Sequence, residues 1–214
     1  MRVVAVSDLH GTLPEVPACD LLLIGGDVTP VENHQISFQA GWLDGAFRRW
    51  LEGVPARQVV GVAGNHDFVF QQRPELVPGG LRWVYLQDSG FEWEGWRIYG
   101  TPWQPWFFDW AFNLYEPDLV AKWAMIPEGT DVLVLHGPPE GYGDWVRDGG
   151  GMKRCGSPSL TERIRVVQPR LVVFGHIHEG RGEWRMGRTV LANVSIVNSG
   201  YKHVHPVWTH VLET

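Results

Sequence analysis

Residues 1–11 read MRVVAVSDLHG: a short apolar run that leads directly into an acidic residue and a histidine, Asp8 and His10. Four later runs, at residues 21–24, 59–62, 132–135 and 171–174, have the same form. Each ends in a polar cluster, and the clusters are Gly25-Gly26-Asp27, Gly64-Asn65-His66-Asp67, His136-Gly137-Pro138-Pro139 and Gly175-His176-Ile177-His178. Because the carboxyl ends of strands in open α/β sheets meet at one crevice, we expect the five clusters to lie together.

The remaining sequence favours an α/β layered fold. A further apolar run lies at residues 98–99, and helix patterns are found at residues 36–51 and 118–125. Ser157 and Pro158 are an N-cap and a first-turn proline for a third helix that runs to about residue 167. Residues 189–197 and 207–212 are extended runs separated by a turn, which predicts antiparallel strands completing a second sheet.

Composition bounds the class of protein. With 214 residues, 44% of them hydrophobic, the chain can bury a substantial core, and no linker or repeat divides it, so we predict one domain over residues 1–214. The net charge of −6 argues against a nucleic-acid polymer as partner. A polar residue follows the first strand too soon for a secretory signal, and no run approaches a membrane span, so a cytoplasmic protein without a membrane partner is expected. Oligomeric state stays open.

The clusters offer carboxylate, imidazole and amide ligands without cysteine, which suits Mn, Fe or Zn. Asp8 and His10 are two residues apart, as are His176 and His178, so each pair can face one ion from extended backbone. Each motif alone also fits an ordinary turn or a buried histidine. Five independent turns, however, have no reason to present this ligand set in this order.

The ordered motifs resemble the calcineurin-like metallophosphoesterase superfamily over nearly the whole chain. The resemblance implies a four-layer αββα sandwich of two mixed β-sheets flanked by helices, and two divalent ions, with Mn favoured over Fe or Zn. It assigns one ion to Asp8, His10, Asp27 and His178, and the other to Asp27, Asn65, His136 and His176. Asp27 would bridge the ions together with a hydroxide that attacks phosphorus. His66 would assist the leaving group and, with Asn65, contact the substrate.

Segments between the motifs are similar to the metallophosphoesterase-domain-containing subfamily, which is related to class III cyclic nucleotide phosphodiesterases. The arginines that protein Ser/Thr phosphatases carry beside two of these motifs are missing, because Val28 follows Asp27 and Ala63 precedes Gly64. The resemblance implies a phosphodiesterase for small phosphoesters, such as 2',3'-cyclic nucleotides, with Asn193 near the nucleotide. Alternatives are a phosphomonoesterase or nucleotide pyrophosphatase with the same site, or a non-catalytic scaffold.

Two departures from the subfamily, and several residues outside its motifs, leave questions open. His176 is retained where some members have Gly, so both ions are expected, and Asp67 replaces a Glu that braces its loop. Residues 103–110 are either a buried loop or an aromatic wall for a base or aryl group. Four cations and four histidines are taken mainly as surface or structural residues, with one cation able to contact phosphate: Arg147, Lys153, Arg154, Arg181, His34, His203, His205 and His210.

Overall fold

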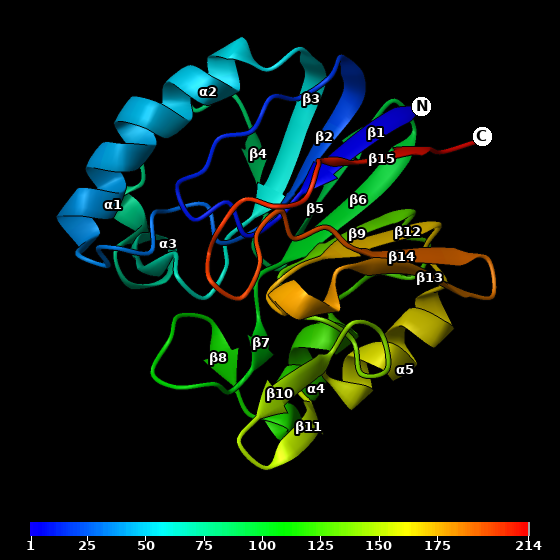
Figure 1. The fold of residues 1–214 in the computed structure, drawn as a ribbon. Coiled ribbons are helices and arrows are strands. Elements are labelled where there is room, and N and C mark those ends of the chain that lie inside the picture. The colour runs from blue at the N-terminus through cyan, green and yellow to red at the C-terminus, as the bar shows by residue number, and fades with distance from the viewer. Residues whose placement is uncertain (214) are drawn as a thin grey trace.

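The computed structural model describes residues 1–213 and contains two large mixed sheets packed face to face (Figure 1). The first sheet has the order β15 (Trp208–Val211), β1 (Arg2–Val6), β2 (Cys19–Gly25), β3 (Ala56–Val62) and β4 (Val84–Tyr85), with only β15 antiparallel. The second has the order β13 (Gly182–Met186), β14 (Thr189–Asn193), β12 (Leu171–Phe174), β9 (Val132–Leu135), β6 (Trp96–Thr101) and β5 (Ser89–Trp93). Its outer strands β13 and β5 are the antiparallel ones.

The strands alternate their side chains between two cores. Val3, Leu21 and Val60 point into the space between the sheets and meet Val132 and Val173 of the second sheet. The residues between them point the other way, toward helices, and are equally buried. This burial on both faces explains the continuous apolar runs of the sequence, because no strand position in these runs meets water.

Helices cover the outer face of each sheet and complete four layers (Figure 1). On the first sheet, α1 (Ile36–Trp42), a π-helical turn (Leu43–Phe47) and α2 (Arg48–Gly53) replace the single helix predicted for residues 36–51, with α3 (Phe68–Gln72) and a 3-10 turn (Pro74–Leu76) beside them. On the second, α4 (Glu116–Ala124) and α5 (Pro158–Val167) pack together. Ser157 caps α5 by accepting the backbone N–H of Leu160 at 3.2 Å. The predicted αββα sandwich is confirmed.

The prediction for the C-terminal strands was wrong in one respect. β14 and β15 do not pair with each other: β14 joins the second sheet between β12 and β13, whereas β15 lies against β1 at the edge of the first. An extended pattern of residues identifies a strand, but it does not identify the neighbour with which that strand exchanges hydrogen bonds.

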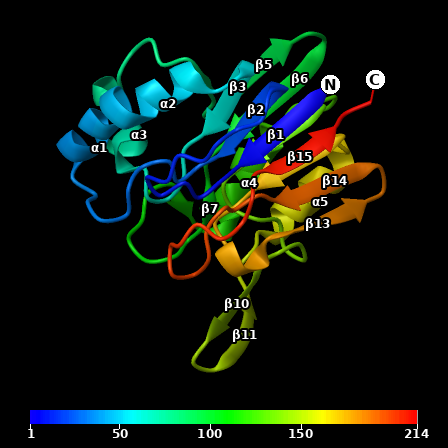
Figure 2. The ribbon, with the colours of Figure 1, turned by 45° about the horizontal axis from the view of Figure 1, so that its top comes forward.

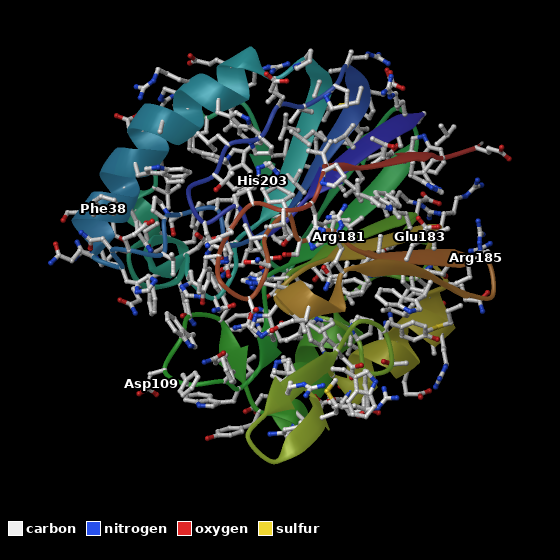
Figure 3. All side chains as sticks on the ribbon, in the orientation of Figure 1. Phe38, Asp109, Arg181, Glu183, Arg185 and His203 are labelled. Atoms are coloured by element: carbon white, nitrogen blue, oxygen red, sulfur yellow. The ribbon has the colours of Figure 1, made fainter. Side chains whose placement is uncertain are left out.

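Two small two-stranded units lie beyond the large sheets, and neither was predicted. β10 (Trp145–Asp148) and β11 (Gly151–Arg154) form an antiparallel hairpin that projects from the body (Figure 2). β7 (Gln104–Pro105) and β8 (Asn113–Leu114) flank a loop marked by Asp109 in Figure 3. Within residues 1–213, no helix has the length and apolar character needed to cross a bilayer.

Candidate metal centre

The five polar clusters converge at one edge of the sandwich, as their places after strands predict. β1, β2 and β3 deliver Asp8, His10, Asp27 and Asn65 from the first sheet, and β9 and β12 deliver His136, His176 and His178 from the second. The sheets are joined there by backbone hydrogen bonds, for example from Ser7 N–H to the carbonyl of Val194 at 3.1 Å. The centre is therefore built from both sheets at once.

The first group of ligand atoms surrounds Nε2 of His178. This nitrogen lies 3.5 Å from Oδ1 of Asp8 and 3.3 Å from Nε2 of His10. Nε2 of His10 lies in turn 3.6 Å from Oδ2 of Asp27. These atoms face one another without intervening side chains, at separations suited to sharing one cation.

The second group surrounds Oδ1 of Asn65. This oxygen lies 2.8 Å from Nε2 of His136 and 2.7 Å from Nδ1 of His176. Nε2 of His136 lies 3.5 Å from Oδ2 of Asp27, the same oxygen that faces His10. A single carboxylate oxygen of Asp27 thus faces both groups, and its other oxygen accepts the backbone N–H of His66 at 2.7 Å.

Backbone carbonyls orient two of the histidine rings by accepting their Nδ1 protons. Nδ1 of His136 lies 2.8 Å from the carbonyl of Gly25, and Nδ1 of His178 lies 3.0 Å from the carbonyl of Asn198. A carbonyl accepts the Nδ1 proton, which leaves the Nε2 lone pair pointing into the centre. This is the outer-sphere arrangement that metal-ligating histidines ordinarily have.

Four of the seven predicted ligands have left-handed backbone conformations. Asp8, His10, Asp27 and His176 have φ of 57°, 43°, 51° and 67°. Each such conformation costs on the order of 1 kcal/mol for a residue with a side chain, so it persists only where the surrounding structure enforces it. Here the turns after the strands enforce these conformations and so direct the four side chains into the centre.

Two glycines allow the ligand loops to approach each other. A Cβ at Gly64 would lie 2.2 Å from Oδ1 of Asp27, and a Cβ at Gly175 would lie 2.2 Å from Oδ2 of Asp8. Neither ligand could stay in place beside a larger residue. Glycine at these two positions is therefore what permits the close approach of the ligand loops.

Asp67 braces its loop through hydrogen bonds to the backbone, as predicted for the acidic residue at this position. Its carboxylate accepts backbone N–H groups of Val28 at 3.1 Å, Thr29 at 2.9 Å and Gly64 at 2.8 Å. The shorter Asp side chain therefore joins the loops after β2 and β3, which carry Asp27 and Asn65.

The electrostatics of the centre favour a cation. Burial lowers the pKa of His10, His136 and His176, which keeps these rings neutral with free lone pairs. Burial, followed by the carboxylates of Asp67 and Asp8, raises the pKa of Asp27. Burial opposes ionisation of Asp8, but its hydrogen bond and ion pair with His178 outweigh burial and lower its pKa.

The donor set therefore fits two divalent cations. Among the described residues, the groups of acidic and histidine side chains whose ligand atoms lie within 4.8 Å of one another include Asp8 with His10 and His178, and Asp8 with Asp27 and His136. A third group, Asp27 with His10 and His66, also places His66 at the centre. The neighbouring carboxylates repel each other unless positive charge lies between them.

Asn193, which the resemblance assigns to the substrate, is buried beside the loop that carries His176 and His178. It is 1% exposed, its amide donates to the carbonyl of Ile177 at 2.8 Å, and its Oδ1 accepts the N–H of Ser195. The side chain supports this loop through these hydrogen bonds.

Three residues at the centre lie outside the ligand motifs, and of these only Trp110 belongs to a segment that the sequence singled out, residues 103–110. Nε2 of His34, which was taken as surface or structural, lies 2.9 Å from Nδ1 of His66. Trp110 packs on His66 with ring centroids 4.2 Å apart, and the ring of Tyr201 lies edge-on to His10 at 4.8 Å. The first and last come from loops whose sequences show no ligand pattern, so spacing alone could not reveal them.

A cavity of about 540 Å³ opens beside His176 and His178. Trp106 and Phe107 line one part of it, and these rings are about half exposed, so residues 103–110 are not simply a buried loop. The ring centroid of Phe107 lies 6.4 Å from that of His176. The segment thus presents aromatic surface at the edge of the centre.

The four predicted surface cations divide into two kinds. Lys153 and Arg154 of β11 line the cavity, whereas Arg147 is exposed. Arg181, labelled in Figure 3, donates to the backbone carbonyls of Ser195 and Pro206. Arg154 also stacks on Trp145 at 4.6 Å. Only Lys153 and Arg154 are therefore placed to meet an anion in the cavity.

Sequence comparison identifies relatives along most of the chain. The family described as calcineurin-like phosphoesterase matches residues 1–180. Human metallophosphoesterase domain-containing protein 1 is 38% identical over 237 residues, covering 96% of this chain and 69% of its own length. A UPF0046 protein of Caenorhabditis elegans is 32% identical and covers 92% of this chain and 56% of its own length.

Comparison with solved structures supports the same fold. The phosphopantetheinyl hydrolase of Mycobacterium tuberculosis has a TM-score of 0.61 at 16% identity, covering 93% of this chain and 90% of that chain. A putative 5'-nucleotidase of Staphylococcus aureus has a TM-score of 0.52 at 13% identity, covering 90% of this chain and 48% of that chain. At these identities the likeness concerns the fold alone.

Proposed function

This chain belongs to the calcineurin-like phosphoesterase family and is a metallophosphoesterase, and from that premise we propose that it is a phosphodiesterase dependent on two divalent cations. The observation that carries the proposal is the position of Asp27, whose Oδ2 lies 3.6 Å from His10 and 3.5 Å from His136, one residue from each ligand group. A bridging carboxylate is what a pair of closely spaced ions requires.

Asp8, His10, Asp27 and His178 would hold one ion, and Asp27, Asn65, His136 and His176 the other. Bound together, two divalent cations acidify a water between them and neutralise the oxygens of a phosphoryl group. The mixture of imidazole, carboxylate and amide ligands suits Mn, Fe or Zn, and we favour Mn.

His66 would donate a proton to the departing oxygen, and with Asn65 it would contact the phosphoryl group. In the free protein, burial and then the charge of His34 lower the pKa of His66 to about 3, so its ring is neutral there. The negative charge of a bound phosphodiester acts in the opposite direction and raises that pKa. Proton donation by His66 is thereby coupled to occupancy by an anionic substrate.

The cavity beside the ligands supports the proposal of a small nucleotide-like or 2',3'-cyclic nucleotide substrate. Its volume of about 540 Å³ lies within the usual range for small-molecule sites. Trp106 and Phe107 offer surface for stacking a base or an aryl group, and Lys153 and Arg154 offer positive charge for a phosphate.

The test is a substrate panel with the Mn²⁺-loaded protein, in the order bis-p-nitrophenyl phosphate, p-nitrophenyl phosphate, 2',3'-cyclic AMP and a dinucleotide polyphosphate. A phosphodiesterase should cleave the first and third faster than the second. Much faster cleavage of p-nitrophenyl phosphate would instead identify a phosphomonoesterase, and cleavage of dinucleotide polyphosphates alone would identify a pyrophosphatase.

Metal analysis separates all of these enzymes from a scaffold. Two metal ions per chain together with turnover support the proposal. No bound metal and no turnover with added Mn²⁺ would favour a non-catalytic interaction module.

A further inference from the structure

His34 reaches the centre from the loop between β2 and α1. Its Nε2 lies 2.9 Å from Nδ1 of His66, and the two rings are tilted by 36° with centroids 5.1 Å apart. At this distance one nitrogen donates a hydrogen bond and the other accepts it. Nδ1 of His66 is therefore occupied, and Nε2 is the ring nitrogen left for the reaction.

The pair is held by aromatic side chains. The ring centroid of Trp110 lies 5.2 Å from that of His34, in an edge-on arrangement, and 4.2 Å from that of His66, in a tilted one. The ring centroids of Phe68 and His34 are 5.3 Å apart. These contacts restrict both rings. His34 thus has a defined place beside His66 and is not a freely solvated surface histidine.

The backbone of His66 is fixed independently of the ring. Its N–H donates to Asp27 at 2.7 Å, and its carbonyl accepts from the side-chain amide of Gln39 at 2.6 Å. These bonds place the Cα but leave the ring free to turn about its last side-chain torsion, which is broad for histidine. Aromatic packing limits this rotation, and the hydrogen bond to His34 is the polar contact that selects one ring orientation.

We propose that His34 is a positioning residue that fixes the ring orientation and the tautomer of His66 for proton donation. The inference rests on the proposed role of His66. With an anionic substrate bound, the ring of His66 is an imidazolium whose Nδ1–H donates to Nε2 of His34. When the bond between phosphorus and the leaving oxygen breaks, its electron pair goes to that oxygen, which takes the proton from Nε2 of His66. His66 is left neutral, with its remaining proton on Nδ1. The hydrogen bond between Nδ1 and His34 is kept throughout.

The test compares leaving groups, because a good leaving group needs no proton donor. Methyl p-nitrophenyl phosphate and methyl phenyl phosphate differ little in size but greatly in leaving-group basicity. His34→Leu should reduce kcat for the phenyl ester by about 10- to 100-fold, a part of the 10²- to 10⁴-fold that general acids contribute. It should reduce kcat for the nitrophenyl ester by less than about threefold, and His34→Gln, which can keep a hydrogen bond to Nδ1, should recover much of the loss.

His66→Ala and His210→Leu are the reference variants. His210 lies on β15 and pairs with Val3 near the start of β1, away from the ligand loops, which follow the end of that strand. Its replacement should leave kcat for both esters unchanged. If His66→Ala shows no dependence on the leaving group, the proposed role of His66 is wrong. If His66→Ala shows it but His34→Leu does not, only the inference about His34 is overturned.

Two readouts do not depend on turnover. Metal content should stay at two ions per chain in His34→Leu. In the Zn²⁺-loaded protein, the ¹⁵N shifts of the His66 ring should report one tautomer in the wild type and an average of two in His34→Leu. A single unchanged tautomer in the variant would show that His34 does not position the ring.

Discussion

Oδ1 of Asp27 accepts the backbone N–H of His66 at 2.7 Å, so the carboxylate that faces both ligand groups also anchors the proposed proton donor. The two oxygens of one side chain therefore join the proposed metal binding to the position of His66. A substitution at Asp27 can separate these tasks, because an amide oxygen can replace Oδ1 as an acceptor but supplies no negative charge.

Asp27→Asn should reduce metal binding while leaving the protein folded. We expect fewer than two ions per chain and a fall in phosphodiesterase activity of at least ~100-fold, the upper end of what loss of a supporting partner costs. Metal analysis and kcat measurement test this, with Asp44→Asn as the control because Asp44 pairs with Arg48 on the exposed face of the helices. Full metal content and wild-type turnover in Asp27→Asn would contradict the bridging assignment.

The sequence predicted that the five polar clusters converge, because each cluster follows the end of an apolar strand. Asp8 after β1 and His136 after β9 lie far apart in the chain, yet parallel strands bring their ends to one edge. The division into two groups around Asp27 came from the resemblance, and the distances from Asp27 to His10 and His136 now agree with it.

The features that the sequence did not predict depend on tertiary contacts that leave no periodic pattern in the sequence. His34 and Tyr201 reach the centre from irregular loops, whose paths follow from packing and not from a repeating pattern. The pairing of β14 and β15 failed for a related reason, because the partner of a strand is set by the whole sheet. The resemblance assigned Asn193 to the substrate, and the structure adds that this side chain is buried and donates to the carbonyl of Ile177.

Gly175→Ala should damage the centre by steric conflict. The new Cβ would lie 2.1 Å from Oγ of Ser7 and 2.2 Å from Oδ2 of Asp8, so the loop after β12 must shift. We expect a loss of about 1–3 kcal/mol in the free energy of unfolding, together with weaker metal binding. Gly41→Ala in α1, where a Cβ meets nothing within 4 Å, is the matched control and should be neutral or slightly stabilising. Equal effects of the two substitutions in thermal melts would refute this account.

Phe107→Ala should weaken substrate binding without disturbing the metals. Phe107 lines the cavity beside His176, whereas the adjacent Phe108 is 68% exposed and does not line it. Stacking of a base on an aromatic ring contributes about 1–3 kcal/mol, so KM for 2',3'-cyclic AMP should rise by at least about fivefold. Phe108→Ala should leave KM unchanged. A similar rise in both variants would point to a general effect on the loop and not to stacking by Phe107.

Metal binding should weaken as the pH falls. Burial and neighbouring carboxylates raise the pKa of Asp27, and although burial opposes it, the contacts with Asp8 raise the pKa of His178. A raised pKa means that each group keeps its proton to a higher pH in the metal-free protein. Because both must lose that proton to bind a cation, protons compete with metal below those pKa values, and stabilisation by metal is lost as the pH falls through them.

The gain in Tm on adding Mn²⁺ should therefore be largest near pH 8 and shrink toward about pH 5.5, where histidine-linked sites ordinarily protonate. Calorimetric titration with Mn²⁺ in buffers of different ionisation enthalpy should show proton release that increases over the same range. His10, His136 and His176, whose pKa values burial lowers, contribute little to this release because they are already neutral. A Tm gain that is equal at both ends of the range would mean that Asp27 and His178 do not bind the metal.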